Sequence, residues 1–293
     1  MSRRFLLNAC LMSIIGFTTV LQSTFTAQNS ASNHGSKPLL ALLSGPQQPT
    51  RVLGGHNVTF QANPWQVALL AAARSSNRNA EFCGGSMVAP RWVLTAAHCV
   101  DQGTSPSQVE VLAGTASLQA GGTRIKIAPN GILVHEQWSP ATHDFDVALI
   151  HVEADLTGSA VAAPSNADPE LQEGQSITVT GWGALAWHQT PGVLTLQGAD
   201  VPYVGSAKCN LPVSYDGHIT ANMLCAGLDL GGIDSCQGDS GGPATAVIAN
   251  QRRLIGIVSW GEGCGSPKKY GVYTRVTQFR GWIRLETNGD VSW

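Results

Sequence analysis

The stretch Gly238-Asp239-Ser240-Gly241-Gly242-Pro243 is the most informative one in this chain. It places a serine between an acidic residue and two glycines, so that a hydroxyl group stands in a tight turn. Glycine allows backbone conformations that are closed to other residues, and it also lets a bound carbonyl group approach exposed N–H groups. The stretch is therefore typical of a turn that presents an activated nucleophile.

Two further motifs supply the groups that a serine nucleophile needs. Thr95-Ala96-Ala97-His98-Cys99 lies upstream, and Asp144-Phe145-Asp146-Val147-Ala148-Leu149-Ile150 lies between it and the serine. A serine hydroxyl is a weak nucleophile at neutral pH, and a histidine with an ordinary pKa of about 6.5 can accept its proton. A carboxylate on the other ring nitrogen would fix the tautomer and stabilise the imidazolium. The chain order of these groups is His98, Asp146, Ser240.

These motifs resemble those of the chymotrypsin-like (trypsin-type) secreted serine endopeptidases over residues 52–293. The resemblance implies hydrolysis of peptide bonds through an acyl-enzyme, with Ser240 as nucleophile, His98 as general base and then acid, and Asp146 as the orienting acid. Asp144 is the rival acid, because residues two apart in a strand share a face. The acid of the family directly precedes a run like Val-Ala-Leu-Ile, and this favours Asp146.

The resemblance also assigns the surroundings of the nucleophile. The N–H groups of Gly238 and Ser240 would form the oxyanion hole, and a plain turn glycine at 238 is the alternative. Asp234 would lie at the base of the primary pocket, with Gly261 and Gly271 as its walls. A buried carboxylate favours a cation, so this pocket predicts cleavage after Arg or Lys. A solvated loop acid at 234 is the alternative.

The bond between Arg51 and Val52 resembles an activation site. Cleavage would free the ammonium group of Val52, which in the family pairs with the acid before the nucleophile, here Asp239. A buried charge that loses its partner is strongly destabilising, so this pair could switch the site between disordered and ordered states. Residues 28–51 are rich in Ser, Asn, Pro and Gln and contain no acid. We therefore expect a zymogen with a pro-segment over 28–51.

The N-terminal residues predict secretion. Two arginines at positions 3 and 4 precede an apolar run over about 5–21, and small or polar residues follow up to position 27. This pattern is that of a signal peptide over 1–27, although an uncleaved membrane anchor is the alternative because the run is nearly long enough to span a bilayer. We expect an extracellular protein, or a periplasmic one if the source is a Gram-negative bacterium.

The cysteine count agrees with an exported protein. Of seven cysteines, six lie beyond the predicted signal peptide. An even number in an exported protein implies disulfides, but spacing alone leaves the connectivity open. The resemblance selects three pairs, which are Cys83–Cys99, Cys209–Cys225 and Cys236–Cys264. No Cys-x-x-Cys pair occurs in the sequence, so we do not expect a zinc site.

Charge and composition narrow the partners. Of 17 basic residues four precede Val52, and all 19 acidic residues follow it, so residues 52–293 carry a net charge of about −6. No basic stripe is evident, which argues against nucleic acid, and the negative charge mildly favours cationic substrates. Residues 112–124 lack the acidic ligands of the calcium loop found in vertebrate trypsins. We expect no metal and no cofactor, and no membrane association after signal cleavage.

The expected partners are protein or peptide substrates with Arg or Lys before the scissile bond, together with protein inhibitors, and we expect a monomer. Two other functions remain open at this point. A catalytically dead homologue that only binds would usually lack a triad residue, and this chain keeps all three. A protease with non-tryptic preference would not need an acid at position 234.

Short runs of Val, Ile, Leu and Thr recur between turn residues, as in an all-β barrel protein. The resemblance makes the fold two antiparallel six-stranded β-barrels, over about 52–160 and 161–276, with a linker within 154–175. A helix is predicted over about 277–288, because Phe279, Trp282 and Ile283 share one helical face. The predicted strands are 66–72, 92–96, 109–113, 124–128, 147–152, 176–181, 195–201, 244–249, 254–260 and 271–276.

Overall fold

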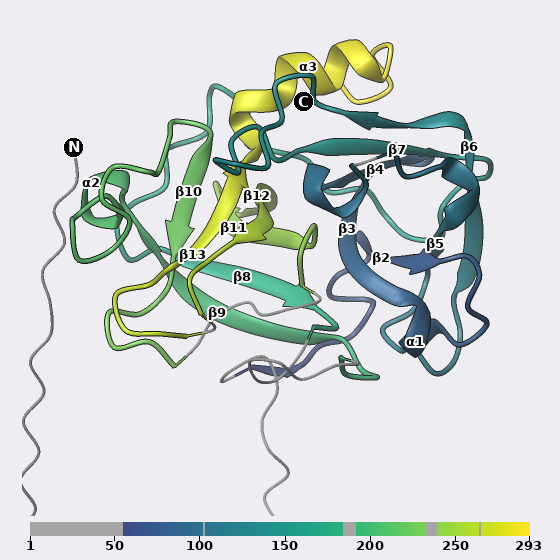
Figure 1. The fold of residues 1–293 in the computed structure, drawn as a ribbon, viewed down its shortest axis with the longest axis horizontal. Coiled ribbons are helices and arrows are strands. Elements are labelled where there is room, and N and C mark those ends of the chain that lie inside the picture. The colour runs from purple at the N-terminus through teal and green to yellow at the C-terminus, as the bar shows by residue number, and fades with distance from the viewer. Residues whose placement is uncertain (1–54, 102, 184–191, 233–238, 264) are drawn as a thin grey trace, which may run out of the picture. The chain divides into compact units, whose positions relative to one another are not determined.

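The first barrel is built from short apolar strands. The computed structural model describes residues 55–101, 103–183, 192–232, 239–263 and 265–293. Antiparallel strands close in the order β2-β3-β4-β7-β6-β5 (Figure 1). Their bounds are β2 Gln66–Ala71, β3 Glu81–Ala89, β4 Trp92–Thr95, β5 Val109–Ala113, β6 Thr123–Val134 and β7 Ala148–Val152, with helix α1 (Asn77–Ala80) before β3.

The second barrel is closed in the same way. Its strands follow the order β9-β10-β13-β12-β11-β8, and the pairing of β8 with β9 completes the ring. Strand β1 (His56–Asn57) adds to the outside of β9. The bounds are β8 Ser176–Gly181, β9 Gln197–Val204, β10 Met223–Ala226, β11 Pro243–Ile248, β12 Gln251–Trp260 and β13 Gly271–Arg275, with helix α2 (Ser206–Cys209) before β10. The fold is thus the predicted pair of antiparallel six-stranded barrels.

The C-terminal segment returns from the second barrel to the first. A 3₁₀ helix spans Val276–Phe279, and helix α3 spans Arg280–Glu286. Phe279 and Ile283 are buried in one cluster with the core of the first barrel. The α-helix is shorter than the predicted helix over 277–288, because the chain first makes a tighter 3₁₀ turn and because Asn288 and Gly289 leave the helix with positive φ.

The contact between the two barrels needs glycine. The N–H group of Gly84 in β3 donates a hydrogen bond to the carbonyl oxygen of Ser240 at 2.7 Å. A Cβ atom added to Gly84 would lie only 2.9 Å from the Cα atom of Gly242. Real Cβ atoms do not come this close to backbone, so a side chain at 84 would push β3 away from the segment that carries the serine.

We expect Gly84→Ala to lower the free energy of unfolding by about 1–3 kcal/mol, because the added methyl group overlaps backbone atoms. Denaturant unfolding in a Ser240→Ala background, which removes self-digestion, measures this change. Gly281→Ala is the matched control, since nothing lies within 4 Å of its added Cβ in α3. It should be neutral or stabilising by up to about 1 kcal/mol. Equal destabilisation by both changes would contradict the close approach.

Candidate active site

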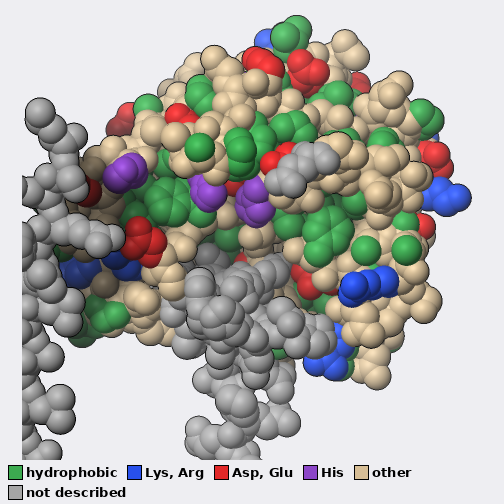
Figure 2. Space-filling view, in the orientation of Figure 1, with side chains coloured by type: hydrophobic (Ala, Val, Ile, Leu, Met, Phe, Trp, Pro, Cys, Tyr) green, Lys and Arg blue, Asp and Glu red, His purple; other side chains and the backbone are tan. Residues whose placement is uncertain are grey.

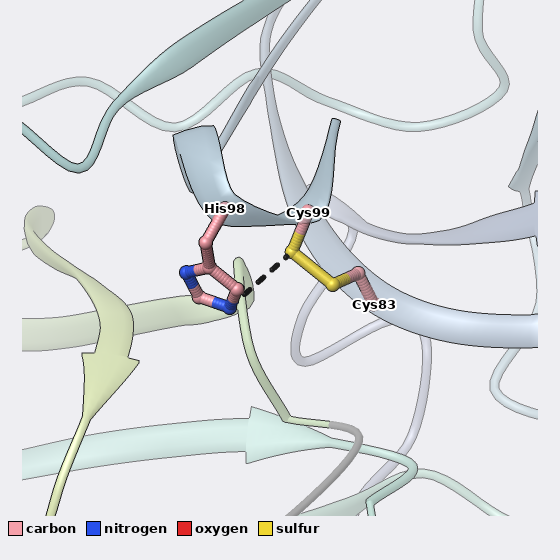
Figure 3. A group of neighbouring side chains, drawn as sticks. All are labelled: Cys83, His98 and Cys99. Carbon is pink, nitrogen blue, oxygen red and sulfur yellow. Dashed lines mark hydrogen bonds between the residues drawn. A yellow bond between two sulfur atoms is a disulfide. The ribbon is translucent and has the colours of Figure 1, made fainter. Parts of the chain in front are cut away.

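The position of His98 is set by a disulfide. Strand β4 ends at Thr95, and a 3₁₀ helix over Ala97–Cys99 presents the histidine. A disulfide joins Cys99 to Cys83 in β3, as predicted. Figure 3 shows the His98 ring beside this disulfide, with its Nε2 atom 3.8 Å from the Cys99 sulfur. The disulfide and the tight helical turn together restrict where the imidazole can lie.

The same three side chains could be mistaken for a metal site. Cys83, His98 and Cys99 are the one group of three potential metal ligands among the described residues. Both sulfur atoms, however, are bonded to each other. A disulfide sulfur is not the thiolate that metals prefer, so this donor set does not fit a metal ion.

His98 is paired with Asp146. The ring Nδ1 atom lies 2.8 Å from Asp146 Oδ2, and the backbone N–H of His98 donates to Asp146 Oδ1 at 2.9 Å. Asp146 is 1% exposed. Its carboxylate is further satisfied by the Ser259 hydroxyl, which donates to Oδ2 at 2.5 Å. The Thr274 hydroxyl donates to the Asp146 carbonyl oxygen at 2.7 Å. Three donors therefore hold the buried carboxylate in place beside the imidazole, and a fourth holds its backbone.

The surroundings of His98 make it a stronger base. Burial lowers the pKa of the imidazole, but the hydrogen bond to Asp146 and the charges of Asp146 and Asp101 outweigh it. The net pKa of His98 lies above its ordinary value. Asp101 is held in place by Trp138, whose Nε1 donates to its Oδ2 at 2.8 Å. The ring is therefore suited to accept a proton and hold it next to Asp146.

The structure separates the two candidate acids. Asp144 does not face the imidazole, because its Oδ1 atom accepts hydrogen bonds from Thr220 and Asn222. The residues around it form a turn and not a strand, with positive φ at His143 and Phe145. Asp144 and Asp146 therefore do not alternate along one strand, and Asp146 is the acid that contacts the imidazole.

The turn with Ser240 packs against the segment that carries His98. The N–H of Gly241 donates to the Val258 carbonyl oxygen at 2.8 Å. Gly241 has a φ of +77°, and an added Cβ would meet Thr95 Oγ1 and lie 3.2 Å from the Cys99 sulfur. Only glycine fits there. The turn that carries Ser240 therefore packs against the segment Thr95–Cys99, which carries His98.

Two of the predicted pocket residues lie side by side. The nearest atoms to a Cβ added at Gly261 belong to Tyr270, Gly271 and Tyr215, at 3.8–3.9 Å. Gly261 therefore faces Gly271, as the two walls of one pocket would. The segment after Gly261 is held by Glu262, whose carboxylate pairs with Lys269 at 2.6 Å. Asp234, at the predicted base of the pocket, is outside the described residues.

Several other predicted residues also fall outside the described part of the chain. They are Arg51, Val52, Cys236, Gly238 and Cys264. The pair Cys209–Cys225 is present as predicted and links α2 to β10.

Aromatic groups that the sequence analysis did not single out lie near His98. The ring of His143 stacks on Trp138 with centroids 6.0 Å apart and meets the edge of Trp260 at 5.7 Å. Burial lowers the pKa of His143. Figure 2 shows histidine side chains near one another on one face, with hydrophobic side chains beside them.

Ser259 and Thr274 were also missed, and only the position of Ser259 before Trp260-Gly261 could have drawn attention to it.

Comparison with known proteins shows the family. The trypsin family model matches residues 52–283. Trypsin 5G1 of Aedes aegypti is 36% identical over 271 residues, which are 90% of this chain and 96% of that protein. Trypsin Tyr p 3.0101 of Tyrophagus putrescentiae is 38% identical over 247 residues, 82% of each chain. Transmembrane protease serine 11E of Mus musculus is 40% identical over 248 residues, 82% of this chain and 56% of that protein.

The chain therefore belongs to the trypsin family and is a serine protease, in agreement with its two barrels and its paired histidine and aspartate. Members of this family act on proteins. Within the described residues, no helix is both long and apolar enough to cross a membrane.

A half-buried acid, Glu81, interacts electrostatically with Asp239 in the turn that carries Ser240. Glu81 begins β3, and its Oε1 atom is covered and has no hydrogen-bond partner among the described residues. Burial, and then the negative charge of Asp239, raise the pKa of Glu81 to about 8. Asp239 is itself buried, and its Oδ1 accepts a hydrogen bond from the N–H of Gly183 at 2.9 Å. Glu81 is therefore mostly protonated at neutral pH.

This proton makes stability depend on pH. The pKa of Glu81 is 4.5 for an unperturbed glutamate and about 8 in the folded protein. The stability that the protonated Glu81 contributes is fully present below a pH of 4.5. It is lost as the pH rises through about 8. Glu81→Gln removes this titration. Between about pH 5 and about pH 9, the unfolding midpoint of the parent should fall relative to that of the variant.

The comparison is made in a Ser240→Ala background, with the exposed Glu153→Gln as control. The control should follow the parent at every pH. Parallel curves for the parent and Glu81→Gln would mean that Glu81 is ionised in the folded protein.

Proposed function

We propose that this protein is a secreted endopeptidase that cleaves after Arg or Lys and is made as a zymogen. The observation that carries the proposal is the buried Asp146 carboxylate bonded to His98, beside the glycine turn of Ser240. This arrangement is the one that nucleophilic attack by a serine requires.

In the proposed mechanism, Ser240 Oγ attacks the carbonyl carbon of the scissile bond and its proton passes to His98 Nε2. The imidazolium donates its Nδ1 proton in a hydrogen bond to Asp146, which stays ionised. The N–H groups of Gly238 and Ser240 stabilise the oxyanion. His98 then protonates the leaving amine, and an acyl-enzyme remains. Water attacks this ester with His98 again as base, which releases the acid and restores the serine.

The preference for Arg or Lys rests on Asp234. The adjacent glycines 261 and 271 support it, because walls without side chains leave room for a long substrate side chain. The names of two relatives, both called trypsins, agree with this preference. A carboxylate at the closed end of such a pocket would attract the cationic end of that side chain.

Activation would follow cleavage between Arg51 and Val52. The buried position of Asp239, next to Ser240, supports this step, since the family pairs the acid at this position with the new ammonium group. In this chain, Val52 would supply that group. Export follows from the predicted signal peptide over 1–27, and the mature enzyme would act as a monomer on proteins or peptides and be subject to protein inhibitors.

The first experiment assays the protein beginning at Val52 on matched peptides that end in Arg, Lys, Phe or Ala. Rapid cleavage after Arg and Lys is expected, and Ser240→Ala should reduce it by about 10⁴-fold or more. Asp234→Asn keeps the size but removes the charge, and it should cost about 2–5 kcal/mol, or roughly 30- to 4,000-fold, on these peptides alone. Cleavage chiefly after Phe would keep the triad and reject the pocket.

The acidic limb of the pH profile reports His98. The histidine must be neutral to accept the proton from Ser240, and its pKa is raised in the structure. The midpoint of kcat/KM on the acidic side should therefore lie above about 6.5. Asp101→Asn keeps the acceptor for Trp138 but removes a charge that raises the pKa of His98, so it should move this midpoint downward. An unchanged midpoint would contradict the role given to Asp101.

A further inference from the structure

Asp144 makes an unusual set of contacts for an acid beside a catalytic pair. Its Oδ1 atom alone accepts three hydrogen bonds, from Thr220 Oγ1 at 3.0 Å, Asn222 Nδ2 at 2.9 Å and the Phe145 N–H at 3.0 Å. Thr220 and Asn222 lie just before β10 and so belong to the second barrel, whereas Asp144 lies just before β7 of the first. One oxygen atom therefore ties the two barrels together two residues from Asp146.

The turn that carries Asp144 needs such a tie. His143 and Phe145, on either side, have φ values of +55° and +56°. Non-glycine residues keep this conformation only where the surroundings enforce it. Within the turn, the Asp144 carbonyl oxygen accepts from the Ser139 N–H at 3.1 Å. The Asp144 side chain adds a restraint from outside the turn through Thr220 and Asn222.

The other end of the tie is rigid. The Asn222 carbonyl oxygen accepts from the N–H of Arg275 at 2.7 Å, and β10 pairs with β13. Strand β13 also supplies Thr274, whose hydroxyl donates to the Asp146 carbonyl oxygen at 2.7 Å. The second barrel thus holds this loop at the Asp144 side chain and at the Asp146 backbone.

We propose that Asp144 is a positioning residue, which holds the Asp146 carboxylate in register with His98 by acting as a hydrogen-bond acceptor for the opposite barrel. The inference rests on the proposed triad mechanism. The positioning depends on the acceptor oxygen of Asp144 and not on its negative charge. All three donors bond Oδ1, and the Oδ1 atom of an asparagine could accept the same three hydrogen bonds.

The charges around His98 agree with this distinction. The charges that raise its pKa are those of Asp146 and Asp101, while His143 on the same turn is the neighbouring titratable group. The carboxylate of Asp144 is instead bonded to Thr220 and Asn222. Its effect would be transmitted by the position of the Asp146 carboxylate.

The test compares Asp144→Ala with Asp144→Asn, and uses Asp200→Ala as control. Asp200 accepts a hydrogen bond from Thr178 on the exposed side of β8 and β9, away from the triad. Asp144→Ala should lower kcat per titrated active site by about 10- to 100-fold, with a smaller change in KM, because misplacement of a catalytic group by about 1 Å has an effect of this size. Asp144→Asn should stay within about twofold of the parent, as should Asp200→Ala.

A second readout does not depend on turnover. In a Ser240→Ala background, NMR follows the His98 Nδ1 proton and the titration of the ring. Asp144→Ala should lower the pKa of His98 and weaken the downfield signal of its bond to Asp146, and Asp144→Asn should restore both. If the parent enzyme does not cleave peptides, the proposed function fails, while this titration still tests the positioning role.

Three results would overturn the proposal. A lower unfolding midpoint in Asp144→Ala, with unchanged kcat per site and unchanged His98 titration, would reduce the residue to a structural contact. Equal losses in the Ala and Asn variants would show that the charge matters. If Asp144→Ala does not fold, Thr220→Val and Asn222→Ala remove the two donors that the second barrel supplies to Asp144. An unchanged titration of His98 in both variants would then contradict the proposal.

Discussion

The buried carboxylate of Asp146 is the constraint on which the rest of the molecule depends. An ion in the interior is tolerated only when donors surround it, and removal of one partner leaves a costly charge. Asp146 receives those donors from both barrels: the backbone and ring of His98 from the first, and the Ser259 hydroxyl from the second. The contact between the two barrels therefore also determines the environment of this carboxylate.

The two barrels approach each other so closely that glycine is required at their contact, including in the motif around Ser240. Gly84 and Gly242 face each other with no room for a Cβ atom, and Gly241 lies against the segment before His98. Residues that look like signatures of catalysis are thus also packing requirements of the barrel interface. Leu254 and Ile257 of β12 share the buried cluster of the first barrel, so apolar burial reinforces the contact.

Strands with a clear pattern could be predicted from the sequence, and others could not. Alternation in Arg124-Ile125-Lys126-Ile127 revealed part of β6, whereas β3 was missed because Gly84 and Gly85 interrupt its apolar run. Strand β10 was missed because its four residues, Met-Leu-Cys-Ala, include no β-branched or aromatic side chain. Its stability comes from pairing with β13 and from the disulfide to Cys209, and both are long-range in the sequence. Local pattern cannot report such tertiary partners.

Some residues of the site could likewise be predicted from the sequence, and others could not. Motifs identified His98 and Ser240 because glycine, alanine and cysteine neighbours mark them. The resemblance to the family favoured Asp146, whereas alternation alone left Asp144 as its rival. The structure separates these two by a turn with positive φ, which alternation cannot anticipate. Ser259 and Thr274 were invisible because a hydroxyl is common in any sequence. They lie on the paired strands β12 and β13, and β12 also pairs with β11, which follows Ser240. The second barrel therefore presents hydroxyl groups from neighbouring elements to one histidine–aspartate pair, and only the closed sheet brings them together.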